Sequence, residues 1–197
     1  LPGIYAWNNY IGYTLLIQGE PEAARVRFRK RMEEYPNTAI GQTGRLGLSY
    51  LMEGKYEEAV SSFNNAVGLS RKNKNIELEI FSRMNLGKIL FVQKKYEESV
   101  NEFEEVERLS WGIFDEKFNP IPVFSHYWKG LALVKKGDFA GAKSQATRLK
   151  DLIEQGNYDK LHLDFYYLLL GRIEVAQQKG PAAQEALDKL SSWTQMV

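Results

Sequence analysis

The sequence contains no cysteine, which excludes disulfide bonds, cysteine nucleophiles and thiolate metal sites and leaves the cellular compartment open. Its 26 Lys and Arg residues nearly balance its 25 Asp and Glu residues, and the net charge of +1 gives no whole-chain bias toward nucleic acid or membranes. No apolar run approaches the ~20 residues that a membrane-spanning helix needs, so no membrane span is predicted. The 197 residues, of which 44% are hydrophobic, are enough to bury a substantial core.

A glycine inside a helical apolar pattern recurs five times along the chain. The five glycines are Gly12, Gly47, Gly87, Gly130 and Gly171. Self-similarity at a period of roughly 20–50 residues is typical of proteins built from stacked repeats. Because glycine inside a helix costs about 1 kcal/mol relative to alanine, its recurrence at one place in each unit predicts close packing between helices.

After each glycine there is a short break and then a second amphipathic pattern, as in "GKYEEAVSSFNNAV" at residues 54–67. The spacings of four and three between Ala59, Phe63 and Ala66 put these side chains on one face of a helix. We therefore predict a helix hairpin in each unit and no strand. The repeat pattern places Gly47 opposite Ala59, and by analogy Gly130 opposite Ala142.

These patterns resemble the tetratricopeptide repeat family over nearly the whole chain. The second unit, residues 40–73, carries the most complete set: Leu46, Gly47, Tyr50, Gly54, Tyr56, Ala59, Phe63 and Ala66. The fourth unit departs from the family pattern, with Lys129 in place of an apolar residue and Ala146 in place of an aromatic ring.

The resemblance implies an all-α, right-handed superhelical solenoid of about five antiparallel helix hairpins, forming a single domain over residues 1–197. The expected repeats are 5–38, 40–73, 80–110, 123–155 and 164–193. The chain does not begin with methionine, and its late repeats resemble those of bacterial multidomain proteins. We therefore expect a fragment of a larger bacterial protein.

An insertion rich in rings and proline occupies residues 109–122, where two prolines rule out a continuous helix. Trp111, Phe114 and Phe118 would be costly to leave in water. The favoured interpretation is that they seal the crevice between the third and fourth units. The alternative is a lid or docking knob.

The family resemblance implies that one stripe of each first helix faces a concave groove. In this chain the stripe is mostly apolar and aromatic, which favours a partner-binding surface over a solvated face. The predicted peptide-binding groove consists of Phe81, Met84, Lys88, Phe91, Phe124, Tyr127, Phe165, Leu168 and Arg172. We predict a protein–protein interaction module that binds a peptide or helical segment. The alternative is a spacer or regulatory segment of a larger signalling protein, with the groove filled by its own chain.

Neither histidine is predicted to be catalytic or to bind metal. His126 and His162 have no histidine or carboxylate three or four residues ahead, the spacing that would build a metal site on a helix. We interpret both as structural, and we predict no catalytic residue, no metal, no cofactor and no enzyme activity.

Charge is uneven locally, with a basic run "RVRFRKR" at residues 25–31 and an acidic run around residues 97–107. Solvated outer faces are the ordinary explanation for such runs. The alternative is charge-complementary self-association between the first and third units. Nucleic acid is not an expected partner, because the basic run is short.

Overall fold

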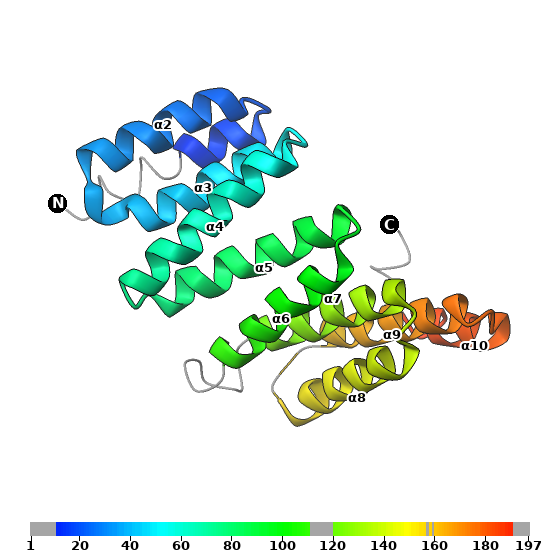
Figure 1. The fold of residues 1–197 in the computed structure, drawn as a ribbon. Coiled ribbons are helices and arrows are strands. Elements are labelled where there is room, and N and C mark those ends of the chain that lie inside the picture. The colour runs from blue at the N-terminus through cyan, green and yellow to red at the C-terminus, as the bar shows by residue number, and fades with distance from the viewer. Residues whose placement is uncertain (1–10, 111–119, 157, 159, 191–197) are drawn as a thin grey trace. The chain divides into compact units, whose positions relative to one another are not determined.

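The computed structural model describes residues 11–110, 120–156, 158 and 160–190. All regular structure in these residues is helical, with no strand (Figure 1). The all-α fold class predicted from the repeats is therefore confirmed. Trp111, Phe114 and Phe118, the rings of the predicted insertion, lie outside the described residues.

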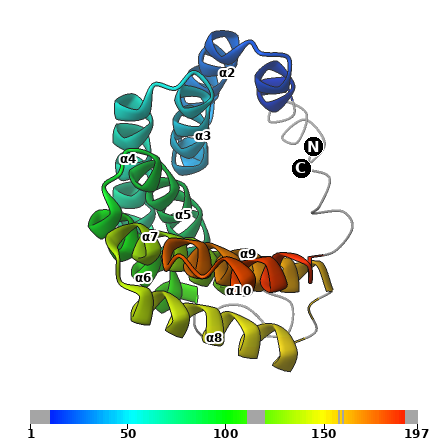
Figure 2. The same ribbon diagram turned by 90° about the vertical axis from the view of Figure 1, so that its right-hand side faces the viewer.

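The helices follow one another in pairs joined by short turns. Residues 11–17 are helical, and the elements after them are α2 (Pro21–Glu34), the short 3-10 helix η1 (Pro36–Thr38), α3 (Ala39–Met52), α4 (Tyr56–Lys72), α5 (Ile76–Val92), α6 (Tyr96–Ser110), α7 (Ile121–Lys136), α8 (Phe139–Gln155), α9 (Lys160–Ala176) and α10 (Gly180–Leu187). Helices α3 and α4 lie side by side, as do α9 and α10 (Figures 1 and 2). These pairs are the hairpins that the sequence pattern predicts.

The chain forms two compact units, Leu1–Ile89 and Leu90–Val197, which we call unit 1 and unit 2. The boundary falls inside α5, so the last turn of that helix belongs to unit 2. The predicted groove residues are consequently divided between the units, and each group is described within its own unit.

Alternating small and large side chains fill the space between paired helices. Phe28 and Phe63 are at most 1% exposed, and Ala24 and Ala59 are fully buried beside them. A methyl group added at Gly47 would lie 2.8 Å from the ring of Phe63, closer than real packing allows. The glycine therefore makes room for the Phe63 ring, which is a more specific role than the predicted contact with Ala59.

Gly130 makes room for a different helix. A methyl group added there would first meet the side chain of Leu169 on α9, at 2.5 Å, and not a residue of α8. The physical reason is that Ala146 occupies the place on α8 where the earlier repeats carry phenylalanine, and Leu169 fills the space beside Gly130. Gly130 is thus a packing residue whose nearest neighbour is Leu169, and its position opposite Ala142 stays a prediction.

Candidate functional site

A row of aromatic side chains runs across unit 2. Its members, which we call the aromatic row, are Tyr96, Phe91, Trp128, Tyr127, Phe165 and Phe124. Each ring meets the next edge to face, with centroids 5.2–5.9 Å apart. This is the favoured geometry for aromatic pairs, because the positive ring edge points at the negative ring face.

Three helices and the last turn of a fourth supply the row. Phe91 ends α5 and Tyr96 begins α6, so a tight turn brings these two rings together, with centroids 5.6 Å apart. Phe124 and Tyr127 are three residues apart on α7 and therefore share a face. Phe165 on α9 contacts both of them, at 5.2 Å each. Four predicted groove residues are thus brought together, and Trp128 joins them without having been predicted.

The aromatic row is half-buried, with one side against the core and the other at the surface. Phe91, Tyr127 and Phe165 pack against a cluster of buried residues that includes Leu169 and Ile173. None of the six rings falls in the buried class. The row therefore helps to hold α7 and α9 together and still presents part of its surface to solvent.

Arg172 places positive charge beside the row. Its side chain is exposed on α9, and Leu168 is half-buried one turn earlier on the same helix. Burial raises the pKa of the Tyr127 hydroxyl, and the positive charge of Arg172 acts in the opposite direction. The predicted combination of aromatic residues and a cation on one face is therefore present in unit 2.

In unit 1 the three predicted groove residues lie on α5 and differ in their surroundings. Phe81 is 38% exposed and meets the Phe63 ring edge to face, with centroids 6.5 Å apart. Met84 is only 8% exposed and belongs to the core. Lys88 is half-buried, and loss of water around its ammonium lowers its pKa. Of the three, only Phe81 offers a large exposed apolar surface.

A second exposed ring lies elsewhere in unit 1. Tyr13 is 36% exposed, and the guanidinium of Arg45 on α3 lies 5.5 Å from its ring centroid. This spacing is within the range of a cation–π interaction. Gly44, one position before Arg45, faces Phe81: a methyl group added at Gly44 would lie 3.4 Å from the Phe81 ring.

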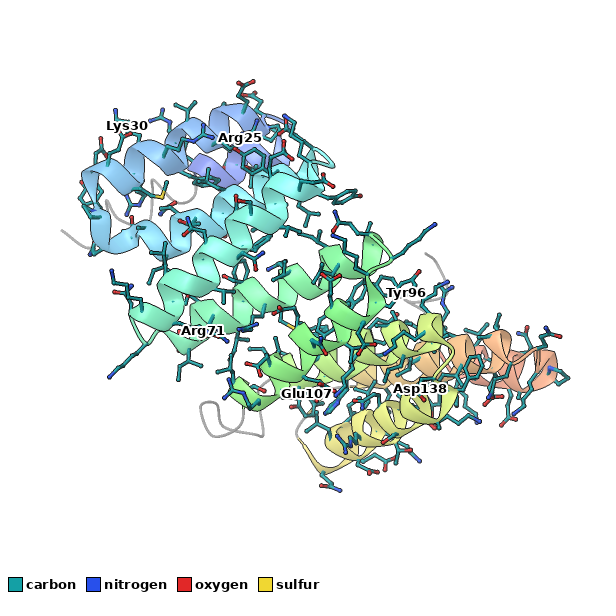
Figure 3. The ribbon with its side chains drawn as sticks, viewed as in Figure 1. Arg25, Lys30, Arg71, Tyr96, Glu107 and Asp138 are labelled. Atoms are coloured by element: carbon teal, nitrogen blue, oxygen red, sulfur yellow. The ribbon has the colours of Figure 1, made fainter. Side chains whose placement is uncertain are left out.

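A cluster of buried charges was missed by the sequence analysis. It joins α6, α7 and α8 through Glu107, His126, Lys129 and Gln145 (Glu107 is labelled in Figure 3). Lys129 Nζ lies 3.1 Å from Glu107 Oε2 and 3.2 Å from an oxygen of Glu104. The Nδ1 atom of His126 lies 2.8 Å from Gln145 Oε1 and 3.1 Å from Glu107 Oε1.

Burial by itself would raise the pKa of Glu107, but the neighbouring His126 and Lys129 hold that pKa below its usual value. The carboxylates of the cluster compensate the charge of Lys129, which is only 7% exposed. The repeat pattern has an apolar residue at this position. Such an arrangement connects three helices through buried polar contacts. We interpret it as structural, in agreement with the structural role predicted for His126.

The described residues were also searched for metal-binding groups and for membrane-spanning helices. Within residues 11–110, 120–156, 158 and 160–190, no three His, Asp or Glu side chains are grouped so that they could hold a metal ion. No helix of the same residues is both long enough and apolar enough to cross a bilayer.

Comparison with known proteins supports the repeat architecture. Residues 44–73, which include all of α4, match the family model for the tetratricopeptide repeat. No curated protein sequence matches the chain significantly.

Solved structures match over most of the chain. BtubC from P. vanneervenii has a TM-score of 0.81 at 17% identity, covering 95% of this chain and 78% of its own. A kinesin light chain-like protein from Podosopora anserina, with nearly identical TPR-like repeats, has a TM-score of 0.76 at 16% identity, covering 95% and 93%. MamA from Desulfovibrio magneticus RS-1 has a TM-score of 0.67 at 18% identity, covering 93% and 91%. At these identities the similarity establishes the fold, a solenoid of the kind formed by tetratricopeptide repeats, and within it residues 44–73 match the tetratricopeptide repeat model.

Proposed function

We propose that this protein is a protein–protein interaction module, and that the aromatic row of unit 2 binds a peptide or a helical segment of its partner. Proteins of this fold family generally mediate protein–protein interactions and are generally not enzymes. The single observation that carries the proposal is the row itself: six rings in continuous contact, none of them buried. Aromatic residues are enriched at interfaces because a rigid ring contributes a large contact area at little entropic cost.

The surroundings of the row indicate the chemistry of the ligand. Apolar side chains of the ligand would cover the exposed parts of Tyr127 and Phe165 and supply most of the affinity. A carboxylate of the ligand would face Arg172, which is exposed and lies near Tyr127. Such a rim charge sets orientation and salt dependence more than affinity. The expected ligand is therefore a segment with apolar anchors and a few carboxylates.

Two groove residues of unit 1 are proposed as further contacts for the same ligand class. Phe81 offers an exposed ring, and Lys88 carries an ammonium that is partly removed from water. A carboxylate brought next to Lys88 would favour its charged form and so offset the cost of its burial. Met84 is not proposed as a contact, because it is buried.

A selection of displayed peptides tests the proposal. Random peptides of about 16 residues are selected against the whole chain, and enriched peptides are synthesised and titrated by calorimetry. The proposal predicts enrichment of aromatic or aliphatic residues with interspersed Asp and Glu. Phe165→Glu should weaken binding at least tenfold, since truncating an anchor typically costs about 2 kcal/mol. Arg172→Glu should weaken it less and reduce its salt dependence.

The matched control is Ile17→Glu, which places the same charge on a side chain that is 85% exposed and outside the row. Circular dichroism must first show that all three glutamate variants are folded. Equal binding by wild type and Phe165→Glu would mean that peptides bind elsewhere. Failure to select any peptide with wild type would favour the spacer interpretation, in which the chain acts as a structural segment of a larger protein.

A further inference from the structure

We propose that the protein forms a two-fold symmetric dimer in which α2 packs antiparallel against α2 of a second copy, centred on Val26. The proposal is independent of the aromatic row, which lies in unit 2, whereas α2 belongs to unit 1. It rests on the exposed apolar side chains of α2 and α3 and on the order of charges along α2.

Two exposed apolar side chains mark the surface. Val26 on α2 is 58% exposed and Met52 at the end of α3 is 57% exposed. Both line an open concavity of about 920 Å³, together with Glu20, Glu22 and Glu53. Hydrophobic side chains around a concavity with a charged rim are typical of a contact surface.

The charges along α2 change sign on either side of Val26. Glu22 precedes Val26 by one turn and lines the concavity beside Met52. Lys30 follows by one turn and lines a second, smaller hollow of about 130 Å³ with Arg27, Arg31 and Glu34 (Lys30 is labelled in Figure 3). The spacing of four residues on each side keeps Glu22, Val26 and Lys30 on one face of the helix.

The charged side chains of this face make few or weak ion pairs within the chain. Among the residues that the structure describes, neither Glu22 nor Arg27 forms an ion pair. Lys30 contacts Glu34 at 3.7 Å, but both side chains are largely exposed and such a pair contributes little. The helix dipole accounts for an acidic first turn and a basic last turn. It does not account for the exposed Val26 between these turns or for the exposed Met52 at the end of α3.

The order of the charges makes the surface complementary to itself. In a two-fold antiparallel pairing about Val26, Glu22 of each copy lies opposite Lys30 of the other, so two equivalent ion pairs form. Val26 meets its symmetry mate, and Met52 extends the apolar contact. A surface that complements itself in this way gives a closed dimer, the commonest form of protein oligomer.

The acidic helix α6 is a less suitable partner for the basic part of α2. Four of its glutamates contact cations of the same chain, and Glu107 does so while buried: Glu97 contacts Lys136, Glu104 and Glu107 contact Lys129, and Glu105 contacts Arg108. Binding of α2 to α6 would also leave Val26 facing a strongly charged helix. A second copy of α2 offers both an apolar centre and unused charge.

Sedimentation equilibrium of the whole 197-residue chain tests the proposal. Wild type should form dimers that weaken as salt is raised, because the flanking ion pairs are exposed to screening. Val26→Asp should raise the dissociation constant at least tenfold, as loss of a central apolar contact typically does. Because Val26 is mostly exposed, this variant should remain folded, which circular dichroism verifies.

Charge reversal then tests the symmetry. Glu22→Lys and Lys30→Glu should each weaken the dimer, because each places like charges opposite one another twice. The double variant Glu22→Lys/Lys30→Glu should recover the wild-type dissociation constant, and a mixture of the two single variants should form a heterodimer.

A chain that stays monomeric at the highest accessible concentration would overturn the proposal. So would a dimer that is indifferent to Val26→Asp, which would place the interface elsewhere. If Lys30→Glu weakened the dimer, Glu22→Lys did not, and the double variant were not restored, the contact would be between α2 and an acidic surface such as α6. That result would also overturn the proposal.

Discussion

Gly47 of α3 lies directly against the ring of Phe63 on α4, so closely that one added methyl group would come within 2.8 Å of the ring. Phe63 is fully buried and cannot move aside cheaply. The glycine is thus a condition for the hairpin between α3 and α4. The same relation holds between Gly12 and Phe28, whereas Gly130 makes room for Leu169.

Two glycine-to-alanine variants should therefore shift stability in opposite directions. Gly47→Ala should lower the free energy of unfolding by about 1–3 kcal/mol, the usual range for an overpacked core. Gly68→Ala in α4 should raise it by roughly 0.5–1 kcal/mol, because alanine favours helix and nothing lies within 4 Å of the added methyl group. Chemical denaturation of both variants measures these free energies of unfolding. A stabilising effect of Gly47→Ala would contradict the packing of Gly47 against Phe63.

An aromatic residue at position 146, where the repeat pattern has a ring, should destabilise the fold. Ala146→Phe should lower the free energy of unfolding by about 1–3 kcal/mol, since Leu169 already fills the space beside Gly130. The double variant Ala146→Phe/Leu169→Ala should recover part of the loss, because the new ring can occupy the vacated volume. Denaturant midpoints of the three proteins provide the test. Independent, additive effects of the two substitutions would mean that the side chains do not compete for space.

The buried charge cluster should make stability depend on pH. The folded-state pKa of Glu107 lies below its ordinary value of 4.5, so its stabilising effect is present above that pH and is lost as the pH falls through the lowered pKa. Glu107→Gln should cost roughly 1.5–3 kcal/mol at neutral pH, the range for a hydrogen bond to a charged group. The gap between variant and wild type should narrow below about pH 4.5.

The control for this experiment is Glu154→Gln, which removes an exposed carboxylate 3.6 Å from Lys150 on the same helix. It should change the thermal midpoint little at any pH, because exposed pairs contribute about 0–1 kcal/mol. A constant gap between Glu107→Gln and wild type from pH 7 to pH 3 would rule out the proposed linkage.

The sequence predicted the helix pairs because glycine recurrence and apolar spacing are local signals. It also predicted four rings of the aromatic row, since their positions repeat relative to the glycines Gly87, Gly130 and Gly171. Trp128 was missed because it lies two residues before Gly130, outside the stripe that the repeat pattern defines. Met84 fits the stripe but is buried by packing, which periodicity alone does not reveal.

The partners of Lys129 and His126 could not be predicted from spacing along one helix. Their contacts come from α6 and α8, so a search three or four residues ahead on α7 finds nothing. The available signal was the lysine itself, at a position where the repeat pattern has an apolar residue. A charge at a core position requires a buried counter-charge, and Glu107 supplies it.

Photo-cross-linking from the aromatic row shows whether a peptide binds there. The photoreactive analogue p-benzoylphenylalanine replaces Phe124 in one protein and Ile17, which is 85% exposed and outside the row, in another. A selected peptide with apolar anchors and carboxylates is then irradiated with each protein. We predict a cross-link to position 124 that excess unlabelled peptide abolishes, and none to position 17. A competed cross-link at position 17 with none at position 124 would contradict peptide binding by the aromatic row.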